Sequence, residues 1–127
     1  MADPRNVVRQ FLDEALVARD PAAIEELVAS GPFRQRVLRF REAFPDLTIR
    51  IEQLVGEGDL VAVRATGRAT HAGTFQGVPP SGKTWTAPCT AIYRVMSGVI
   101  TDGWVQWDLL SILEQIGGVR RLDGASA

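Results

Sequence analysis

Residues 70–83, THAGTFQGVPPSGK, and residues 98–117, GVITDGWVQWDLLSILEQIG, are the two stretches that decide the fold of this chain. The first holds glycines and prolines at a density that favours a long irregular loop over a regular element. The second follows a short Met96-Ser97-Gly98 connection, and its apolar and aromatic residues continue up to Asp108. This pattern predicts a hairpin whose second strand leads directly into a last helical turn.

Working outward, strand-like alternation also precedes the loop. Leu47, Ile49 and Ile51 alternate with polar residues, which indicates a strand with one dry face. A Gly-Glu-Gly-Asp turn over 56–59 follows it. The sequence therefore predicts an antiparallel sheet with strands at Leu47–Val55, Leu60–Thr70, Thr84–Val95 and Val99–Asp108.

The first third of the chain has helical periodicity instead. Asp3-Pro4 and Asp20-Pro21 each combine an N-cap acceptor with a proline at the first helical position. Apolar residues then recur at three- and four-residue spacing, which predicts two helices, and a third from Phe33 to Phe44 stops at Pro45. Leu109 to Ile116 adds one or two helical turns. Helices first and an antiparallel sheet second is an α+β order, in which helices cover one face of a curved sheet.

Length and composition limit the class of protein. The 127 residues suffice for one domain with a proper core and are too few for two, so we expect a single domain over 1–117 and a flexible tail over 118–127. The net charge of −1, with arginines interleaved with carboxylates, gives no basis for binding nucleic acid. No stretch approaches the run of about 20 apolar residues that spans a bilayer, so no membrane association is expected.

The N-terminus lacks the build of a signal peptide, and the single cysteine, Cys89, fits a reducing compartment. We therefore expect a cytoplasmic protein. One histidine and one cysteine cannot make a closed metal site of His and Cys ligands. Neither a metal nor an organic cofactor is expected.

A set of short motifs covers most of the chain from Phe44 to Gly117. They are Phe44-Pro45-Asp46-Leu47, Gly56-Glu57-Gly58-Asp59, Thr70-His71-x-Gly73-x-Phe75-x-Gly77-x-Pro79-Pro80-Ser81-Gly82-Lys83, Tyr93-Arg94, Gly98-Val99-Ile100, and Trp104-x-x-x-Asp108 leading into Leu113-x-Gln115-x-Gly117. Their order and spacing resemble the SnoaL-like polyketide cyclases of the NTF2-like superfamily. The resemblance implies a cone-shaped α+β barrel, in which a strongly bent sheet wraps over a long helix and leaves a pocket at its open end.

The resemblance also implies an activity, that of an ester cyclase of the lyase or isomerase type in polyketide biosynthesis. Relatives include isomerases, hydratases, epoxide hydrolases and non-catalytic binders, so the fold alone does not decide the reaction. The chain departs from the family in a shortened segment at Ala29-Ser30-Gly31, and in Gln106, where many relatives carry a histidine.

Asp108 is the leading candidate for chemistry. Alternation puts Trp104, Gln106 and Asp108 on one face of the last strand, and the resemblance assigns this face to the pocket. A carboxyl group desolvated beside an indole suits a general acid or base. The resemblance implies that Asp108 moves protons during an intramolecular aldol ring closure. The alternative is that Asp108 caps the helical turn starting at Leu109, and the two roles are compatible.

Other side chains complete the predicted site. His71, the only histidine, either partners Asp108 and polarises a substrate carbonyl or is a satisfied turn residue. Gln106 can hold an enolate or carbonyl oxygen, or can be an amide at the rim of the sheet. Residues predicted to bind substrate are Trp104, Arg64, Tyr93 and Phe75. For Arg64 the alternative to a ligand carboxylate is a solvated or dimer-facing stripe, and for Tyr93 it is a core ring.

The leading hypothesis is therefore a cofactor-independent enzyme that cyclises a hydrophobic, carbonyl-rich small molecule. Epoxide opening, hydrolysis or isomerisation on the same fold is an alternative, and so is a non-catalytic module that binds an apolar ligand or a pocket kept only as part of a dimer scaffold. The exposed face of the sheet predicts a homodimer.

Overall fold

The computed structural model describes residues 3–120 and 122. Its strands form one antiparallel sheet in the order β1-β2-β3-β4. The strands are β1 (Thr48–Glu57), β2 (Leu60–Thr70), β3 (Thr84–Met96) and β4 (Val99–Trp107), and the helical segments are α1 (Pro4–Gln10), η1 (Phe11–Val17), α2 (Pro21–Leu27), α3 (Pro32–Ala43) and α4 (Leu109–Ile116). The predicted α+β architecture is confirmed.

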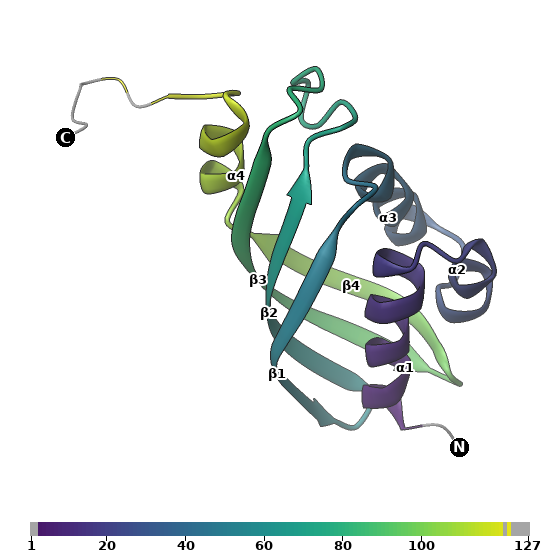
Figure 1. Cartoon of the computed structure of the whole chain (residues 1–127). Helices are drawn as coiled ribbons and strands as arrows, with labels where there is room; N and C mark the ends of the chain where they lie inside the picture. The colour runs from purple at the N-terminus through teal and green to yellow at the C-terminus, as the bar shows by residue number, and fades with distance from the viewer. Residues whose placement is uncertain (1–2, 121, 123–127) are drawn as a thin grey trace.

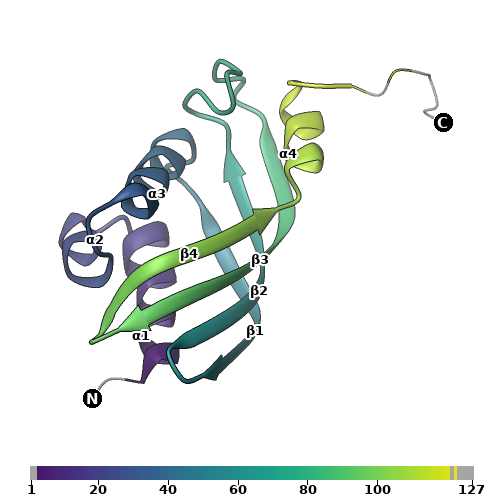
Figure 2. The same cartoon turned by 180° about the vertical axis from the view of Figure 1, so that it is seen from behind.

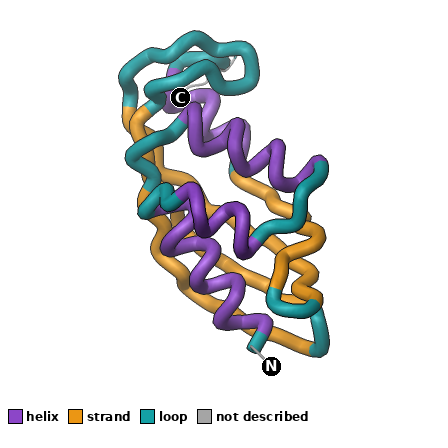
Figure 3. Tube along the Cα trace, turned by 90° about the vertical axis from the view of Figure 1, so that its right-hand side faces the viewer, coloured by secondary structure: helices purple, strands orange, loops and turns teal. Residues whose placement is uncertain are grey.

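The sheet is strongly curved, and the first three helices lie on its concave side (Figure 1). A view turned by 90° shows the strands curving around the helices (Figure 3). From behind, β4 is seen to cross the molecule as an edge strand (Figure 2). No helix in the described part of the chain is long and apolar enough to cross a membrane.

The helices begin where the sequence predicts. The Asp3 carboxylate accepts a hydrogen bond from the Arg5 backbone N–H at 2.9 Å, and Asp20 does the same for Ala22 at 3.0 Å. The first helix is less regular than expected, because its second half, η1, is π-helical. Such segments are rare and occur frequently at functional sites.

The strands also match their predicted ranges to within two residues. The last strand ends at Trp107 rather than Asp108, and α4 follows directly. Gly117 closes α4 in the left-handed region with φ 84°. A glycine favours this conformation because it has no Cβ to clash. Most of the predicted tail, 118–127, lies outside the described residues, and its flexibility stays a prediction.

The middle of the concave face is built from small side chains. Alternate residues of β2 and β3 are buried on this face, and the central ones are Ala65, Gly67, Ala87, Cys89 and Ala91. Large rings stand only toward the ends of these rows. The small residues leave a hollow between the sheet and the helices that lie over it.

Two glycines let large rings approach the sheet closely. A Cβ on Gly67 would lie 2.5 Å from the Trp107 ring, and a Cβ on Gly103 would lie 2.5 Å from the Phe33 ring. Real Cβ atoms do not approach other atoms so closely, so no other residue fits at either position without a shift. These contacts fix Trp107 and Phe33 against the concave face.

Candidate functional site

A cavity of about 630 Å³ lies between the concave face and the helices η1 and α3. This volume is within the range of small-molecule sites. Its floor includes Val63 and three of the small central residues of β2 and β3, namely Ala65, Cys89 and Ala91. The hollow that the small residues leave is thus an open cavity rather than a filled core.

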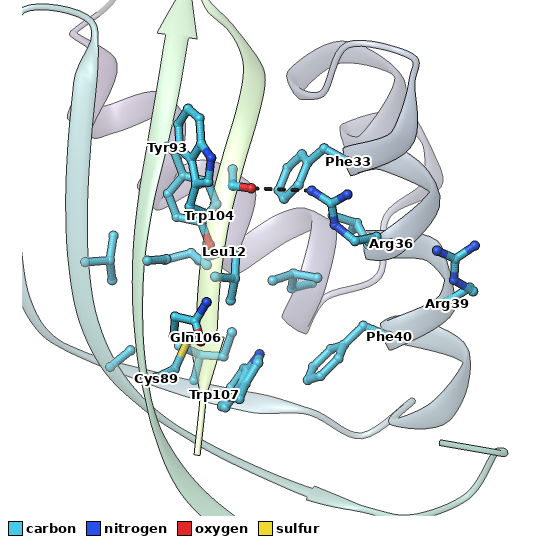
Figure 4. A pocket seen from close by; sticks show the side chains of 18 of the residues that line it. Leu12, Phe33, Arg36, Arg39, Phe40, Cys89, Tyr93, Trp104, Gln106 and Trp107 are labelled. Atoms are coloured by element: carbon cyan, nitrogen blue, oxygen red, sulfur yellow. Dashed lines mark hydrogen bonds between the residues drawn. The ribbon is translucent and has the colours of Figure 1, made fainter. Parts of the chain in front are cut away.

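Aromatic rings stand at both ends of this cavity (Figure 4). At one end Phe11, Phe33 and Tyr93 form a cluster with centroid separations of 5.7–6.2 Å. At the other end Phe40 stacks on Trp107 at 5.2 Å with 16° between the ring planes. Offset and edge-to-face contacts of this kind hold rings in fixed positions. The two clusters set the length of the apolar space.

Tyr93 supplies a polar group within this apolar space. Its side chain is buried and lines the cavity, and within the described residues its hydroxyl has no hydrogen-bond partner. Burial raises the pKa of Tyr93 above its ordinary value of 10.0, and a smaller contribution comes from Cys89. The hydroxyl therefore keeps its proton and is free to donate a hydrogen bond to a ligand oxygen.

Cys89 lies on the cavity floor but is a poor nucleophile. Burial raises the pKa of its thiol from 9.0 to about 12. The thiolate is the reactive form, and it is scarce at neutral pH when the pKa is this high. Cys89 therefore acts as a small apolar residue.

The charged residues that line the cavity are two arginines, Arg36 and Arg39 of α3. Among the described residues that line it there is no Asp, Glu or His. Nor do the described residues contain any group of three or more His, Cys, Asp or Glu side chains that could hold a metal ion.

The hairpin between β3 and β4 contains a β-bulge. Val95 pairs with Ile100, but the next residue, Arg94, pairs with Asp102. Thr101 is therefore an extra residue in β4. Because side chains alternate along a strand, every residue of β4 after the bulge faces the side opposite to the one it would have in a regular hairpin.

The shifted register decides which face of β4 lines the cavity. Tyr93, on the concave face, pairs with Gly103, so Trp107 lies on the concave face as well. Trp104 and Gln106 belong to the convex face, and both are exposed. They contribute to the cavity lining where β4 forms the open edge of the sheet. The prediction that these two residues line the pocket therefore holds at this edge, although the bulge turns their strand face outward and places Trp107 on the concave face.

Asp108 lies outside the cavity lining. It is exposed and is the N-cap of α4, with its carboxylate accepting a hydrogen bond from the Ser111 backbone N–H at 3.1 Å. Leu109, the next residue, does line the cavity, so Asp108 directly precedes a residue of the lining. The expected placement in an apolar hollow is wrong, whereas the alternative role as a helix cap is confirmed.

His71 is fully buried in the loop rather than in the cavity lining. The Ser81 backbone N–H donates to its Nδ1 at 3.1 Å, so Nδ1 is an acceptor and Nε2 carries the hydrogen. Nε2 lies 3.2 Å from the Val78 carbonyl oxygen and donates to it. Both ring nitrogens are thus engaged within the loop, which supports the alternative of a satisfied turn residue. In the described structure no hydrogen bond joins His71 and Asp108.

The four residues predicted to bind substrate have different positions. Tyr93 and Phe75 line the cavity, and Trp104 lines its edge. Arg64 does not line it, because its strand position belongs to the exposed convex face and its Nε donates to the Gln53 side-chain oxygen at 3.0 Å. The prediction that Arg64 reaches a ligand in this cavity is wrong, since alternation along β2 points it the other way.

Sequence reasoning missed several lining residues, notably Arg36, Phe40 and Trp107. One signal could have indicated the cavity. Small residues at every second position of two neighbouring strands, such as Ala65 and Ala91, cannot fill the space beneath a pair of helices. No pattern in the sequence marks Arg36 apart from the other arginines of its helix.

The sequence model of the SnoaL-like polyketide cyclase family matches residues 3–116. The chain belongs to this family. No curated protein matches it significantly.

Solved structures agree with this assignment. IdmH from Streptomyces antibioticus, a candidate polyketide cyclase, is 28% identical with a TM-score of 0.72 over 91% of this chain and 99% of that one. A candidate SnoaL-like polyketide cyclase from Jannaschia sp. CCS1 is 25% identical with a TM-score of 0.78 over 92% and 93%. TsrD from Streptomyces laurentii, 24% identical with a TM-score of 0.76 over 94% and 100%, shows the likeness of fold alone.

Cys89 should make stability depend on alkaline pH. Since its folded-state pKa of about 12 exceeds the ordinary 9.0, the unfolded chain releases the thiol proton first. Below pH 9.0 the thiol makes its full contribution to the free energy of unfolding. As the pH rises toward about 12, this free energy falls by up to about 1.4 kcal/mol per pH unit. Urea unfolding between pH 8 and 11 should therefore show a shallower decline for Cys89→Ala than for wild type. If the free energies of unfolding of wild type and Cys89→Ala change equally with pH, the raised pKa of Cys89 is wrong.

His71 should matter for stability. His71→Ala leaves the Ser81 N–H and the Val78 carbonyl without their partner, which we expect to cost about 2 kcal/mol in the free energy of unfolding. Lys83→Ala, an exposed change in the same loop, serves as the control and should cost far less. Urea denaturation measures both. An unchanged midpoint for His71→Ala, together with lost turnover, would instead indicate a chemical role.

Proposed function

We propose that the chain binds a hydrophobic, carbonyl-bearing small molecule in its cavity and promotes the intramolecular cyclisation of that molecule. The observation that carries the proposal is an aromatic cavity of about 630 Å³ that contains the unpartnered Tyr93 hydroxyl. Membership of the SnoaL-like polyketide cyclase family supports the same class of substrate.

Confinement supplies the first part of the mechanism. Rings at both ends, Phe33 and Tyr93 at one and Phe40 and Trp107 at the other, limit how an extended chain can lie. A substrate folded between them brings its reacting carbons together, which removes much of the entropic cost of ring closure.

Tyr93 supplies the second part. In an aldol closure the attacking carbon first loses its proton, which the two flanking carbonyls of a β-dicarbonyl substrate make acidic enough to pass to solvent. As the new carbon–carbon bond forms, negative charge develops on the oxygen of the attacked carbonyl, and this oxygen then takes a proton from solvent. A hydroxyl that keeps its proton in an apolar setting stabilises this oxygen more in the transition state than in the ground state. Tyr93 is suited to this donation because it is a buried lining residue that carries a hydroxyl.

Proton transfer by Asp108 remains a separate hypothesis. The carboxylate would remove the proton from the carbon that attacks, and it directly precedes Leu109, a residue of the cavity lining. To take part it must leave its hydrogen bond with the Ser111 N–H.

A binding module without chemistry is the second candidate. It is favoured by a specific observation, because the described lining residues include no Asp, Glu or His that could act as a general base. In that case the cavity would hold or deliver an apolar ligand without changing it.

Two substitutions separate these possibilities. Tyr93→Phe should lower turnover by about 100-fold with little change in folding, because it removes one donor to the developing oxyanion. Asp108→Asn preserves the helix cap, since asparagine caps as well as aspartate, and should leave turnover within a few-fold of wild type. Ring closure of synthetic aryl β-diketones, followed by absorbance, provides the measurement.

Each outcome has a distinct meaning. Loss of turnover in Asp108→Asn with wild-type thermal stability would establish proton transfer by Asp108. Unchanged turnover in Tyr93→Phe would reject its role as the oxygen donor. If wild type binds the diketones and closes none of them, the binding module is the correct function.

We also infer a homodimer formed through the convex face. Val55, Ala62, Ile92 and Trp104 are successive register partners and form one apolar row across all four strands. Val55, Ile92 and Trp104 are 62%, 46% and 51% exposed. A contiguous exposed row of this kind is typical of an interface.

Ile92→Glu should disrupt this dimer, because it buries a charge in the centre of the row. Size-exclusion chromatography with light scattering should give a dimer for wild type and a monomer for the variant. Gln10→Glu on the exposed side of α1 adds the same charge elsewhere and should stay dimeric. A wild-type chain that elutes only as a monomer would reject the interface.

A further inference from the structure

The cavity differs in charge from the chain as a whole. The chain has a formal net charge of −1, but the charged groups lining the cavity are Arg36 and Arg39. Both arginines are exposed, so they border the apolar space on its solvent-facing side. Two cations there, with no described carboxylate in the lining, favour ligands that carry a negative group.

Two other arginines of α3, Arg34 and Arg41, have partners that indicate a structural role. Arg34 donates to the Val28 carbonyl oxygen and forms an ion pair with Glu25 at 3.5 Å. Arg41 donates to the Arg19 carbonyl oxygen at 2.9 Å. These two residues connect α3 to the segments that precede it in the chain.

Arg36 is held but not neutralised. Its guanidinium lies over the Phe33 ring, 5.7 Å from the centroid, and its Nη2 donates to the Gly103 carbonyl oxygen at 3.4 Å. Figure 4 shows it extending from α3 toward β4, with Arg39 farther along the same helix. The long hydrogen bond is weak, and a guanidinium has five N–H donors, so most of its capacity is unused.

The groups around Arg36 leave it available. A smaller pocket of about 240 Å³ adjoins the cavity, because Phe33, Arg36, Gly103 and Trp104 line both. Asp102 also lines this smaller pocket, yet within the described residues it forms no ion pair with Arg36. The carboxylate reduces the local positive charge without occupying the donors of Arg36.

We infer that the cavity selects acidic ligands: an apolar, aromatic body between the two ring clusters and a carboxylate, or an equivalent monoanion, bound by Arg36. The inference rests on the proposed binding function and adds the charge of the ligand. A planar guanidinium matches a carboxylate through two parallel hydrogen bonds, and its ring contact with Phe33 keeps it in position. Arg39 adds positive charge at a greater distance.

Two fluorescent probes test this inference. 8-Anilinonaphthalene-1-sulfonate is anionic, and N-phenyl-1-naphthylamine has the same aromatic body without the charge. Wild type should bind the anionic probe more tightly, and the two probes should compete for one site. Higher salt should weaken binding of the anionic probe alone.

Single substitutions locate the effect. Arg36→Gln should weaken binding of the anionic probe by about tenfold and leave the neutral probe unchanged, because it removes one charge-assisted pair. Arg39→Gln should have a smaller effect in the same direction. Arg64→Gln removes the same charge from the convex face and should change neither affinity. Asp102→Asn should strengthen binding of the anionic probe.

The outcomes are separable. If the neutral probe binds and Arg36→Gln does not change binding of the anionic probe, the inference is wrong while the proposed binding function stands. An equal loss in Arg64→Gln would also overturn it, because the effect would then be one of overall charge. If neither probe binds, the proposed function itself fails.

Discussion

The cavity of this protein depends on a packing constraint at the centre of its sheet. In a fold of this kind, the side chains on the concave face fill the space between the backbone of the sheet and the helices. Here the central residues, such as Ala65 and Ala91, are too short to fill that space, while rings at both ends hold η1 and α3 away. Close packing is thus satisfied at the ends and not in the middle. The apolar site follows from the order of small and large residues along two strands.

The β-bulge at Thr101 adds a second constraint. By reversing the faces of β4 it brings Trp107 over Gly67 and moves Trp104 to the convex face. One tryptophan, Trp107, therefore lines the cavity, and the other, Trp104, extends the exposed apolar row. One inserted residue links the shape of the site to the surface through which we infer that the chain pairs.

The candidate site divides into parts that the sequence reveals and parts that it hides. Tyr93 and Phe75 are recognisable because they belong to the motifs that carry the family resemblance. Arg36 is not recognisable, because α3 carries other arginines with the same local sequence character, and only their partners distinguish them. His71 shows the reverse, since its isolation in the sequence suggested chemistry and the loop satisfies both of its ring nitrogens.

The elements, their order and the family can all be recognised in the amino-acid sequence. Asp3 and Asp20 with their prolines start the helices, alternation marks the strands, and glycines mark the turns, because each of these signals acts through neighbouring residues. In contrast, the face of β4 that meets the helices, and the position of Asp108 as a helix cap, emerge only from the three-dimensional structure. Those outcomes depend on the pairing of residues distant in sequence. A single bulge in that pairing changes the face of the sheet on which every later residue of the strand lies.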